Sequence, residues 1–227
     1  QHRIARRQRQ MCIRDRLTVI CNIFVNVKID SNNLPIMETF FSIQGEGFHS
    51  GKSAYFIRIG GCDVGCHWCD VKESWDHGKH QIVGVDDIVS KISGTNLVII
   101  TGGEPLMWDM TVLTKKIKKN KMVVHLETSG AYNLSGKWDW ICLSPKKQKL
   151  PKKEIYEIAN ELKIIIYNRH DLEFALEESK KVSDKCKLFL QPEWDRFEKN
   201  KSLIFEFIKK NPNWNLSLQL HKFMGID

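Results

Sequence analysis

Short apolar segments alternate along this chain with segments in which apolar residues recur at helical spacing. Runs rich in β-branched and aromatic residues predict strands over residues 53–59, 96–101, 122–127, 140–143, 162–166, 187–191 and 214–218. Apolar residues three or four positions apart predict helices over residues 85–93, 106–119, 151–161, 171–183 and 198–210. Strands that alternate with helices favour parallel βαβ units with right-handed crossovers.

This alternation limits the architecture. Nearly continuous apolar strands indicate a sheet that is covered on both faces. The strand–helix units are too few for a closed eight-stranded barrel. We therefore expect an α/β fold, a partial (β/α)6-type barrel of parallel strands with abbreviated helices, and an open doubly wound sheet is the alternative. In either architecture the functional side chains lie at the carboxyl ends of the strands.

The first 34 residues differ from the rest in composition. Residues 1–16 are rich in Gln and Arg, and the apolar stretch 17–27 is interrupted by Asn22 and Asn26. No small-residue cleavage site follows, as a secretion signal would require. We interpret residues 1–34 as a disordered or non-native extension and residues 35–227 as one domain.

Charge and hydropathy exclude several classes of protein. The net charge is +8, but the first 36 residues carry +5 of it and the other 191 residues only +3. The domain therefore lacks a general electrostatic basis for binding nucleic acid. No run of 18 uncharged apolar residues occurs, so we expect no transmembrane helix and no membrane partner.

The chemistry of the chain concentrates in a cysteine cluster. Cys62, Cys66 and Cys69 form the pattern C-x3-C-x2-C directly after the strand 53–59. An odd total of seven cysteines does not suit a disulfide framework, and the cluster indicates a metal site in a reducing compartment. Three thiolates can hold three irons of a [4Fe–4S] cube and leave the fourth iron open to a ligand. Structural zinc and unbound thiols are the alternatives, although zinc sites more often pair two C-x2-C motifs.

This loop resembles the signature of the radical S-adenosylmethionine (SAM) superfamily, in which an aromatic residue, here Trp68, precedes the third cysteine. A second motif, residues 101–105 (TGGEP), follows the strand 96–101 and resembles the superfamily segment that binds the methionine amino group. A plain strand–turn–helix connection is its structural alternative. The resemblance implies a [4Fe–4S] cluster and SAM, which together supply a 5′-deoxyadenosyl radical that the protein orients and shields.

Further motifs narrow the resemblance to one family. In order, residues 43–47 (IQGEG), the cluster loop, TGGEP, residues 127–130 (ETSG), 144–146 (SPK), 191–192 (QP) and 221–223 (HKF) resemble the 7-carboxy-7-deazaguanine synthases. The resemblance implies a carbon–nitrogen lyase. It converts 6-carboxy-5,6,7,8-tetrahydropterin to 7-carboxy-7-deazaguanine by radical ring contraction with loss of ammonia, in the biosynthesis of 7-deazapurines such as queuosine.

The resemblance also implies roles for individual residues. The cluster ligands are Cys62, Cys66 and Cys69. The expected SAM contacts are Trp68, Cys69, Asp70, Gly103, Ser144, Pro145, Lys146, Gln191, Pro192, Glu193 and Trp194. The expected pterin contacts are Ile43, Gln44, Gly45, Arg58, Thr101 and Asp227.

Two of these interpretations have structural alternatives. A guanidinium suits a pterin carboxylate because it binds in bidentate form, but Arg58 could also be a surface charge at a strand end. His221 is interpreted as a packing residue near the terminus. No catalytic side chain is expected beyond the cluster and the SAM radical.

The metal requirement is in doubt at one position. Family members that use Mg²⁺ carry a hydroxyl residue where this chain has Val71. A valine offers no oxygen to a hard cation. We expect either weak Mg²⁺ dependence or oxygen ligands from Glu73, Ser74 or Asp76.

The expected partners are the pterin, a second copy of the chain in a homodimer, and an electron donor such as a flavodoxin or ferredoxin. Reduced thiols favour a cytoplasmic location. Two other functions remain open. One is an activating enzyme for glycyl-radical enzymes within the same superfamily, which would act on a protein, and the other is a non-catalytic metal-binding module.

Overall fold

The computed structural model describes residues 28–226. Its strands are β1 (Asn33–Ile43), β2 (Ser53–Ile59), β3 (Gln81–Gly84), β4 (Leu97–Gly102), β5 (Val123–Thr128), β6 (Trp140–Leu143), β7 (Glu161–Ile166), β8 (Lys187–Pro192) and β9 (Trp214–Leu216). Its α-helices are α1 (Val85–Ser90), α2 (Thr111–Lys119), α3 (Lys153–Ile158), α4 (His170–Ser179), α5 (Phe197–Lys210) and α6 (Leu220–Met224).

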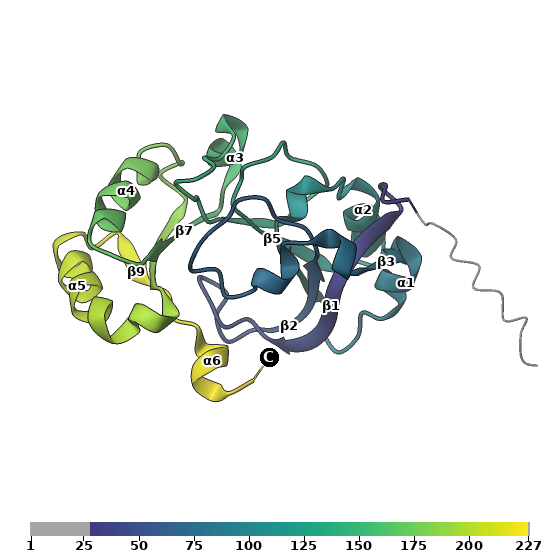
Figure 1. The fold of residues 1–227 in the computed structure, drawn as a ribbon, viewed down its shortest axis with the longest axis horizontal. Coiled ribbons are helices and arrows are strands. Elements are labelled where there is room, and N and C mark those ends of the chain that lie inside the picture. Colours follow the sequence, from purple (N-terminus) through teal and green to yellow (C-terminus); the bar gives the residue numbers. More distant parts are fainter. Residues whose placement is uncertain (1–27, 227) are drawn as a thin grey trace, which may run out of the picture.

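The strands form one curved sheet in the order β3-β1-β2-β4-β5-β6-β7-β8-β9. From β2 through β4 to β9 every neighbouring pair is parallel, whereas β1 and β3 extend one edge in antiparallel pairing. The sheet bends around an open centre and its two edges do not pair (Figure 1). The expected α/β partial barrel of parallel strands is confirmed.

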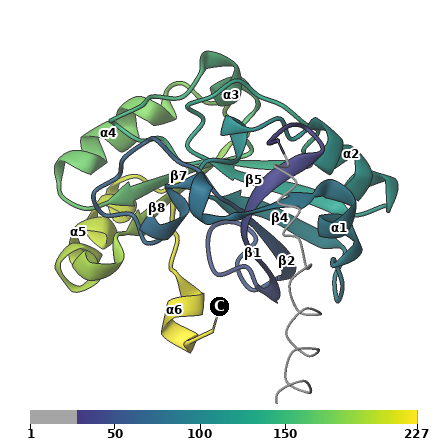
Figure 2. The same cartoon turned by 45° about the vertical axis from the view of Figure 1, so that its right-hand side comes forward.

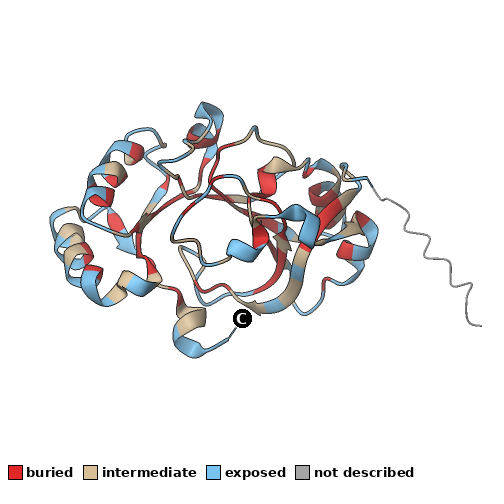
Figure 3. Ribbon diagram, in the orientation of Figure 1, coloured by how far each residue is buried: buried red, intermediate tan, exposed pale blue. Residues whose placement is uncertain are grey.

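The central strands are buried on both faces, as their continuous apolar sequences predict. In β4, the consecutive residues Val98, Ile99 and Ile100 are all inaccessible to solvent. Buried positions follow the sheet around its curve and recur on one side of each outer helix (Figure 3). The hydrophobic core is therefore the layer between the sheet and its helices.

Helices α1 to α5 lie around the outer side of the sheet, and α6 lies apart from them near the end of the chain (Figure 1 and Figure 2). Helix α2 packs on β5 and buries Leu113 and Ile117, while α4 packs on β7 and buries Leu172 and Ala175. Among the residues that the structure describes, no helix is long and apolar enough to cross a membrane.

The structure differs from the sequence-based expectation at the edge of the sheet. Strands β1 and β3 and helix α6 have no counterpart among the predicted elements. Strand β1 is recognisable only from its partners, because its polar and apolar residues do not alternate regularly and its register with β2 contains an irregularity after Ile36. One face of this pairing is fixed by Phe40 and Phe56, whose rings stack at 5.1 Å.

The predicted extension falls mainly on residues 1–27, which lie outside the described residues. Strand β1 begins at Asn33, two residues before the predicted boundary, and the side chain of Leu34 is fully buried. The end of this predicted segment therefore belongs to the sheet.

The helix predicted over residues 106–119 begins later than expected. Residues 105–107 form a single 3-10 turn, and α2 starts only at Thr111. The indole Nε1 of Trp108 donates to the carbonyl of Gly60 at 2.9 Å, which holds the intervening chain extended against the end of β2. The Asp109 carboxylate then accepts from the Thr111 amide at 2.9 Å and starts the helix.

A buried histidine in β5 makes the stability of this fold sensitive to acid. The ring centres of His125 and His49 lie 4.5 Å apart, and residue His125 is 7 % exposed. Burial lowers the pKa of His125 from 6.5 to about 4. The unfolded chain therefore takes up this proton at a higher pH than the native protein does, and native stability falls as the pH drops from 6.5 towards 4.

We expect His125→Phe to lessen this loss of unfolding free energy by about 2–3 kcal/mol, since the variant has no proton to bind there. Urea unfolding between pH 7.5 and 4 measures it. His170→Gln, which changes a side chain that is 82 % exposed, is the control. An unchanged pH dependence in His125→Phe would contradict the assignment.

Candidate active site

A cavity of about 440 Å³ opens at the carboxyl ends of the parallel strands, on the inner side of the curved sheet. Residues at or just after the ends of β2, β4, β5, β6 and β8 line it, together with the loop after β1 and the region of α6. Parallel strands in a partial barrel direct these segments towards one place. The cavity is therefore where the sequence motifs meet.

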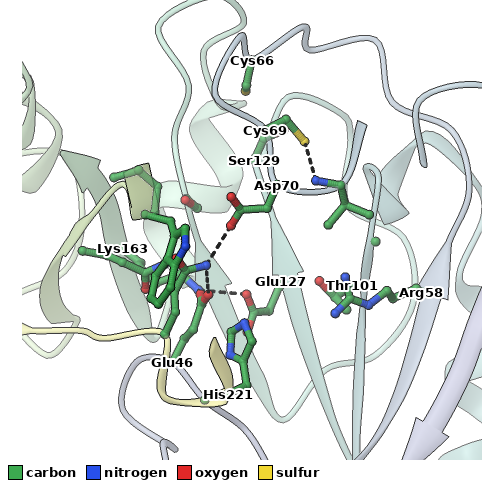
Figure 4. A pocket seen from close by; sticks show the side chains of 18 of the residues that line it. Glu46, Arg58, Cys66, Cys69, Asp70, Thr101, Glu127, Ser129, Lys163 and His221 are labelled. Carbon is green, nitrogen blue, oxygen red and sulfur yellow. Dashed lines mark hydrogen bonds and ion pairs between the residues drawn. The ribbon is translucent and has the colours of Figure 1, made fainter. Parts of the chain in front are cut away.

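The cysteine loop lies along one side of this cavity. Cys62, Cys66 and Cys69 all contribute to the lining. Burial raises the pKa of the Cys62 thiol to about 11 and also raises that of Cys66. The backbone N–H of Val71 donates to Cys69 Sγ at 3.4 Å (Figure 4), the kind of contact that tunes iron–sulfur ligands. The cavity thus holds three cysteine side chains from one loop, which are the donors that an iron–sulfur cluster requires.

The two glycines at the end of β4, Gly102 and Gly103, allow it to dock directly on the cysteine loop. A side chain at Gly103 would place its Cβ 2.2 Å from the carbonyl oxygen of Gly61, and one at Gly102 would lie 2.3 Å from that of Ile59. Gly102 also has φ +123°, which disfavours any residue with a side chain. Only glycine fits at these two positions.

Glu104 joins this turn to the next strand. Its carboxylate is buried and accepts from the Thr128 hydroxyl at 2.6 Å, from the Ser129 amide at 2.8 Å and from the Ser129 hydroxyl. It also accepts from the Leu106 amide at 3.0 Å. Four donors compensate the buried charge and fix the GGEP turn against the end of β5.

The turn after β6 brings a lysine to the cysteine loop. Lys146 Nζ donates to the carbonyl and hydroxyl oxygens of Ser144 at 2.6 and 2.7 Å, and it lies 5.5 Å from the centre of the Trp68 ring. Burial lowers the pKa of Lys146. Ser144, Lys146 and Trp68, which were predicted from two separate motifs, thus form one wall of the cavity.

The end of β8 forms the adjoining wall. Gln191 is buried and accepts through Oε1 from the Ser217 hydroxyl at 2.7 Å. The carboxylate of Glu193 accepts from the amides of the following turn, those of Asp195 and Arg196. Glu193 therefore holds the turn that presents Trp194.

Arg58 lines the cavity at the end of β2, close to Thr101 (Figure 4). Its Nε lies 3.0 Å from a Glu38 oxygen in an ion pair without hydrogen-bond geometry, and its guanidinium lies over the Phe40 ring. It is therefore held against the wall rather than extended into solvent, and the surface-charge interpretation does not describe it.

The floor of the cavity contains three charged residues that were not predicted. Lys163 Nζ, on β7, lies 2.5 Å from Glu46 Oε2 and 2.9 Å from Glu127 Oε2 (Figure 4). Gln44 donates to Glu127 at 2.8 Å. A lysine within an otherwise apolar strand was the sequence signal for this group, because unpaired buried lysines are rare.

Helix α6 closes the cavity from the side of the C-terminus. Its first amide, that of Leu220, donates to the Gly45 carbonyl at 3.0 Å, and Lys222 pairs with Asp70 at 2.8 Å. The His221 ring packs on Gly45, where a Cβ would come within 2.3 Å of Nδ1. His221 lines the cavity, so its interpretation as a mere packing residue is incomplete.

The structure brings almost all predicted site residues together. Two of them are exceptions: Pro145 does not reach the cavity lining, and Asp227 lies outside the described residues. The remaining predicted residues line one cavity: Ile43, Gln44, Gly45, Arg58, Cys62, Cys66, Trp68, Cys69, Asp70, Thr101, Gly103, Ser144, Lys146, Gln191, Pro192, Glu193 and Trp194.

Comparison with known proteins identifies the family. The chain is 56% identical over 194 residues to the 7-carboxy-7-deazaguanine synthase of Flavobacterium psychrophilum, covering 85% of this chain and 92% of the relative. The chain belongs to the 7-carboxy-7-deazaguanine synthase family. The synthase of a Synechocystis strain is 48% identical, with 85% of this chain and 93% of the relative covered.

Two further comparisons agree with this family membership. The radical SAM superfamily matches residues 56–143, which run from β2 to β6 and contain both the cysteine loop and the GGEP turn. The crystal structure of QueE from Escherichia coli superposes with a TM-score of 0.75 at 30% identity, covering 83% of this chain and 95% of that chain. The chain is thus a radical SAM enzyme of the deazaguanine synthase family.

The close approach of Gly103 to Gly61 yields a testable prediction for this family member. We expect Gly103→Ala to lower the free energy of unfolding by about 1–3 kcal/mol, because the new methyl group meets a backbone carbonyl that cannot rotate away. Thermal and urea unfolding measure it. Gly78→Ala, where the nearest atom is the end of the Asp76 side chain at 3.2 Å, should lose less than about 1 kcal/mol. Equal losses in both variants would contradict the role of the close contact.

Proposed function

We propose that this protein converts 6-carboxy-5,6,7,8-tetrahydropterin to 7-carboxy-7-deazaguanine with loss of ammonia, in the biosynthesis of 7-deazapurines such as queuosine. One observation carries the proposal: a single cavity is lined by the cysteine loop and by the segment of Gln44 and Gly45, with Arg58 beside them. A generic radical SAM enzyme needs the first feature but not the other two.

The donor set suits a [4Fe–4S] cluster and SAM, because three free cysteine thiols of one loop line the same cavity. Cys62, Cys66 and Cys69 would hold three irons and leave the fourth without a protein ligand, and the glycines of the GGEP turn line the same cavity. When bound, the cluster and SAM supply the radical that abstracts a hydrogen atom from the substrate. The protein's part is to bind both molecules and to keep water away from them.

The remaining walls suit a second, flat molecule with a carboxylate. Arg58 offers a guanidinium for that carboxylate. At the floor, the oxygens of Glu46 and Glu127 are acceptors for the N–H groups of an aminopyrimidinone ring. The SAM contacts proposed are those of the Ser144–Lys146 turn, of Gly103 and of the turn after β8, which contribute residues to the lining of the same cavity.

The proposal extends to partners and location. We propose a homodimer, an electron donor of the flavodoxin or ferredoxin type and a cytoplasmic site of action. The five described cysteines are free thiols, which supports a reducing compartment.

The reaction is tested directly on iron–sulfur-reconstituted protein under anaerobic conditions. With SAM, a reductant and 6-carboxytetrahydropterin, we expect mass spectrometry to detect the deazaguanine acid. Cys66→Ala should form none, because it lacks one cluster ligand. Cleavage of SAM by the wild type without any deazaguanine product would contradict the pterin as substrate, and the activation of a glycyl-radical enzyme would become the leading function.

A separate prediction concerns Mg²⁺. Val71 lines the cavity, whereas Glu73, Ser74 and Asp76 do not, and the Ser74 hydroxyl donates to the Val71 carbonyl at 2.7 Å. The Asp76 carboxylate accepts from the Gly78 amide at 3.0 Å, and none of the three alternative ligands reaches the cavity lining. We expect activity with EDTA and with added Mg²⁺ to agree within about twofold, because the position beside the cluster loop offers no oxygen side chain.

Val71→Thr is the matched variant, since it exchanges one methyl group for a hydroxyl. We expect Mg²⁺ to stimulate Val71→Thr more than it stimulates the wild type. Strong stimulation of the wild type, with the ion bound beside Val71, would contradict this prediction.

A further inference from the structure

Lys163 is a buried cation at the floor of the cavity, on strand β7, where it is flanked by Leu162 and Ile164. Its side chain is 4 % exposed, against 17 % for Glu46 and 22 % for Glu127. The ammonium contacts one oxygen of each carboxylate, at 2.5 and 2.9 Å. Lys163 thus lies behind two carboxylates that face the cavity, and it does not itself form an open binding surface.

Both carboxylates are held by a second partner as well. Gln44 Nε2 donates to Glu127 Oε1 at 2.8 Å, and Gln219 Nε2 donates to Glu46 Oε1 at 3.0 Å. Each carboxylate therefore has one oxygen on the ammonium and the other on an amide. A carboxylate has about four acceptor positions, so capacity remains for donors that arrive from the cavity.

The charges of this group do not cancel. Burial by itself would raise the pKa of Glu46, but the adjacent Lys163 ammonium outweighs it and holds that pKa at about 2. Burial likewise opposes the charge of Lys163, but Glu127 and Glu46 raise its pKa well above the ordinary value. One ammonium and two carboxylate groups give the floor a formal charge of −1.

Other titratable groups surround this triad from the neighbouring elements. They are Glu161 on β7, Cys142 on β6, His221 on α6 and Lys146 after β6. Burial raises the pKa of both Glu161 and Cys142, which favours their neutral forms. Among the groups around the floor, Lys163 is the cation in direct contact with both carboxylates.

Without that cation, the two carboxylates would share a poorly solvated site. Two carboxylates that share one site repel each other, which favours protonation of one of them. A protonated carboxyl group has fewer acceptor positions and no charge to offer. The state of the floor thus depends on Lys163.

We propose that Lys163 is a positioning residue for substrate: it keeps Glu46 and Glu127 ionised and fixed, so that the floor accepts hydrogen bonds from the N–H edge of an aminopyrimidinone ring. This inference rests on the proposed function. It adds a residue that acts through the two glutamates and without contact to the reacting atoms.

The test is equilibrium binding and steady-state kinetics of Lys163→Met with 6-carboxytetrahydropterin between about pH 6 and pH 9. We expect KM for the pterin, relative to wild type, to rise about tenfold or more at the low end, because one carboxyl group is protonated there. The ratio should fall as the pH rises and both groups ionise. The KM for SAM should change less than about twofold. In the exposed control Lys153→Met, the KM for the pterin and the KM for SAM should each change less than about twofold.

Two charge-conserving variants separate charge from packing. Lys163→Met with Glu46→Gln, and Lys163→Met with Glu127→Gln, each keep the net charge of −1 with a single carboxylate. We expect the pterin KM of both, relative to wild type, to be independent of pH. In these variants no two carboxylates are buried side by side without a cation. They therefore still test the inference if Lys163→Met alone does not fold.

The outcomes separate this inference from the proposed function. If the wild type binds no pterin, the proposed function fails. If the wild type binds it and the affinity of Lys163→Met falls by the same factor at every pH, the role is structural and the inference is overturned. The inference is also overturned if both double variants keep the pH dependence of the single variant.

Discussion

The close contact between the ends of β2 and β4 is the constraint on which the site depends. Gly102 and Gly103 lie so near the backbone of Ile59 and Gly61 that no side chain fits between them. Two backbone hydrogen bonds, from Gly103 to Ile59 and from Glu104 to Gly61, both of 2.8 Å, close the gap. The loop that carries the cysteines therefore starts directly beside the turn expected to bind the methionine group of SAM. The cysteine loop and the GGEP turn lie close together because their backbones are in direct contact, with no side chain between them.

From this contact the site extends around the sheet through buried polar groups. Glu104 reaches across to β5, and the Ser144–Lys146 turn after β6 reaches back to Trp68. Each buried charge has named partners, which offset the cost of removing it from water. These contacts fix the positions of the walls, which suits chemistry in which a reactive radical must meet one hydrogen atom and no solvent.

The cavity has two differently built ends. At the cluster end, the thiols and Lys146 are held among apolar and aromatic groups. At the other end, Glu46, Glu127 and Lys163 form a floor with an excess of negative charge. Helix α6 and the residue before it join the two, because Lys222 pairs with Asp70 beside the cluster while Gln219 donates to Glu46 at the floor. This segment thus links the side proposed for the cofactors to the side proposed for the substrate.

The sequence by itself determined the parallel α/β architecture and the main motifs. Local signals sufficed there: apolar runs for β4 and β7, three cysteines at fixed spacing, and a pair of glycines at a strand end. Because carboxyl ends of parallel strands converge, these motifs could be expected to meet, and nearly all predicted site residues do line one cavity.

Only the tertiary structure decided the rest. Strand β1 is defined by pairing with β2 and β3, so its irregular pattern carried little information about it. The triad of Glu46, Glu127 and Lys163 joins residues separated by 36 to 117 positions in the chain. Its members are ordinary charged residues when seen singly. Their function as a unit depends on burial and mutual distance, and folding alone fixes both of these quantities.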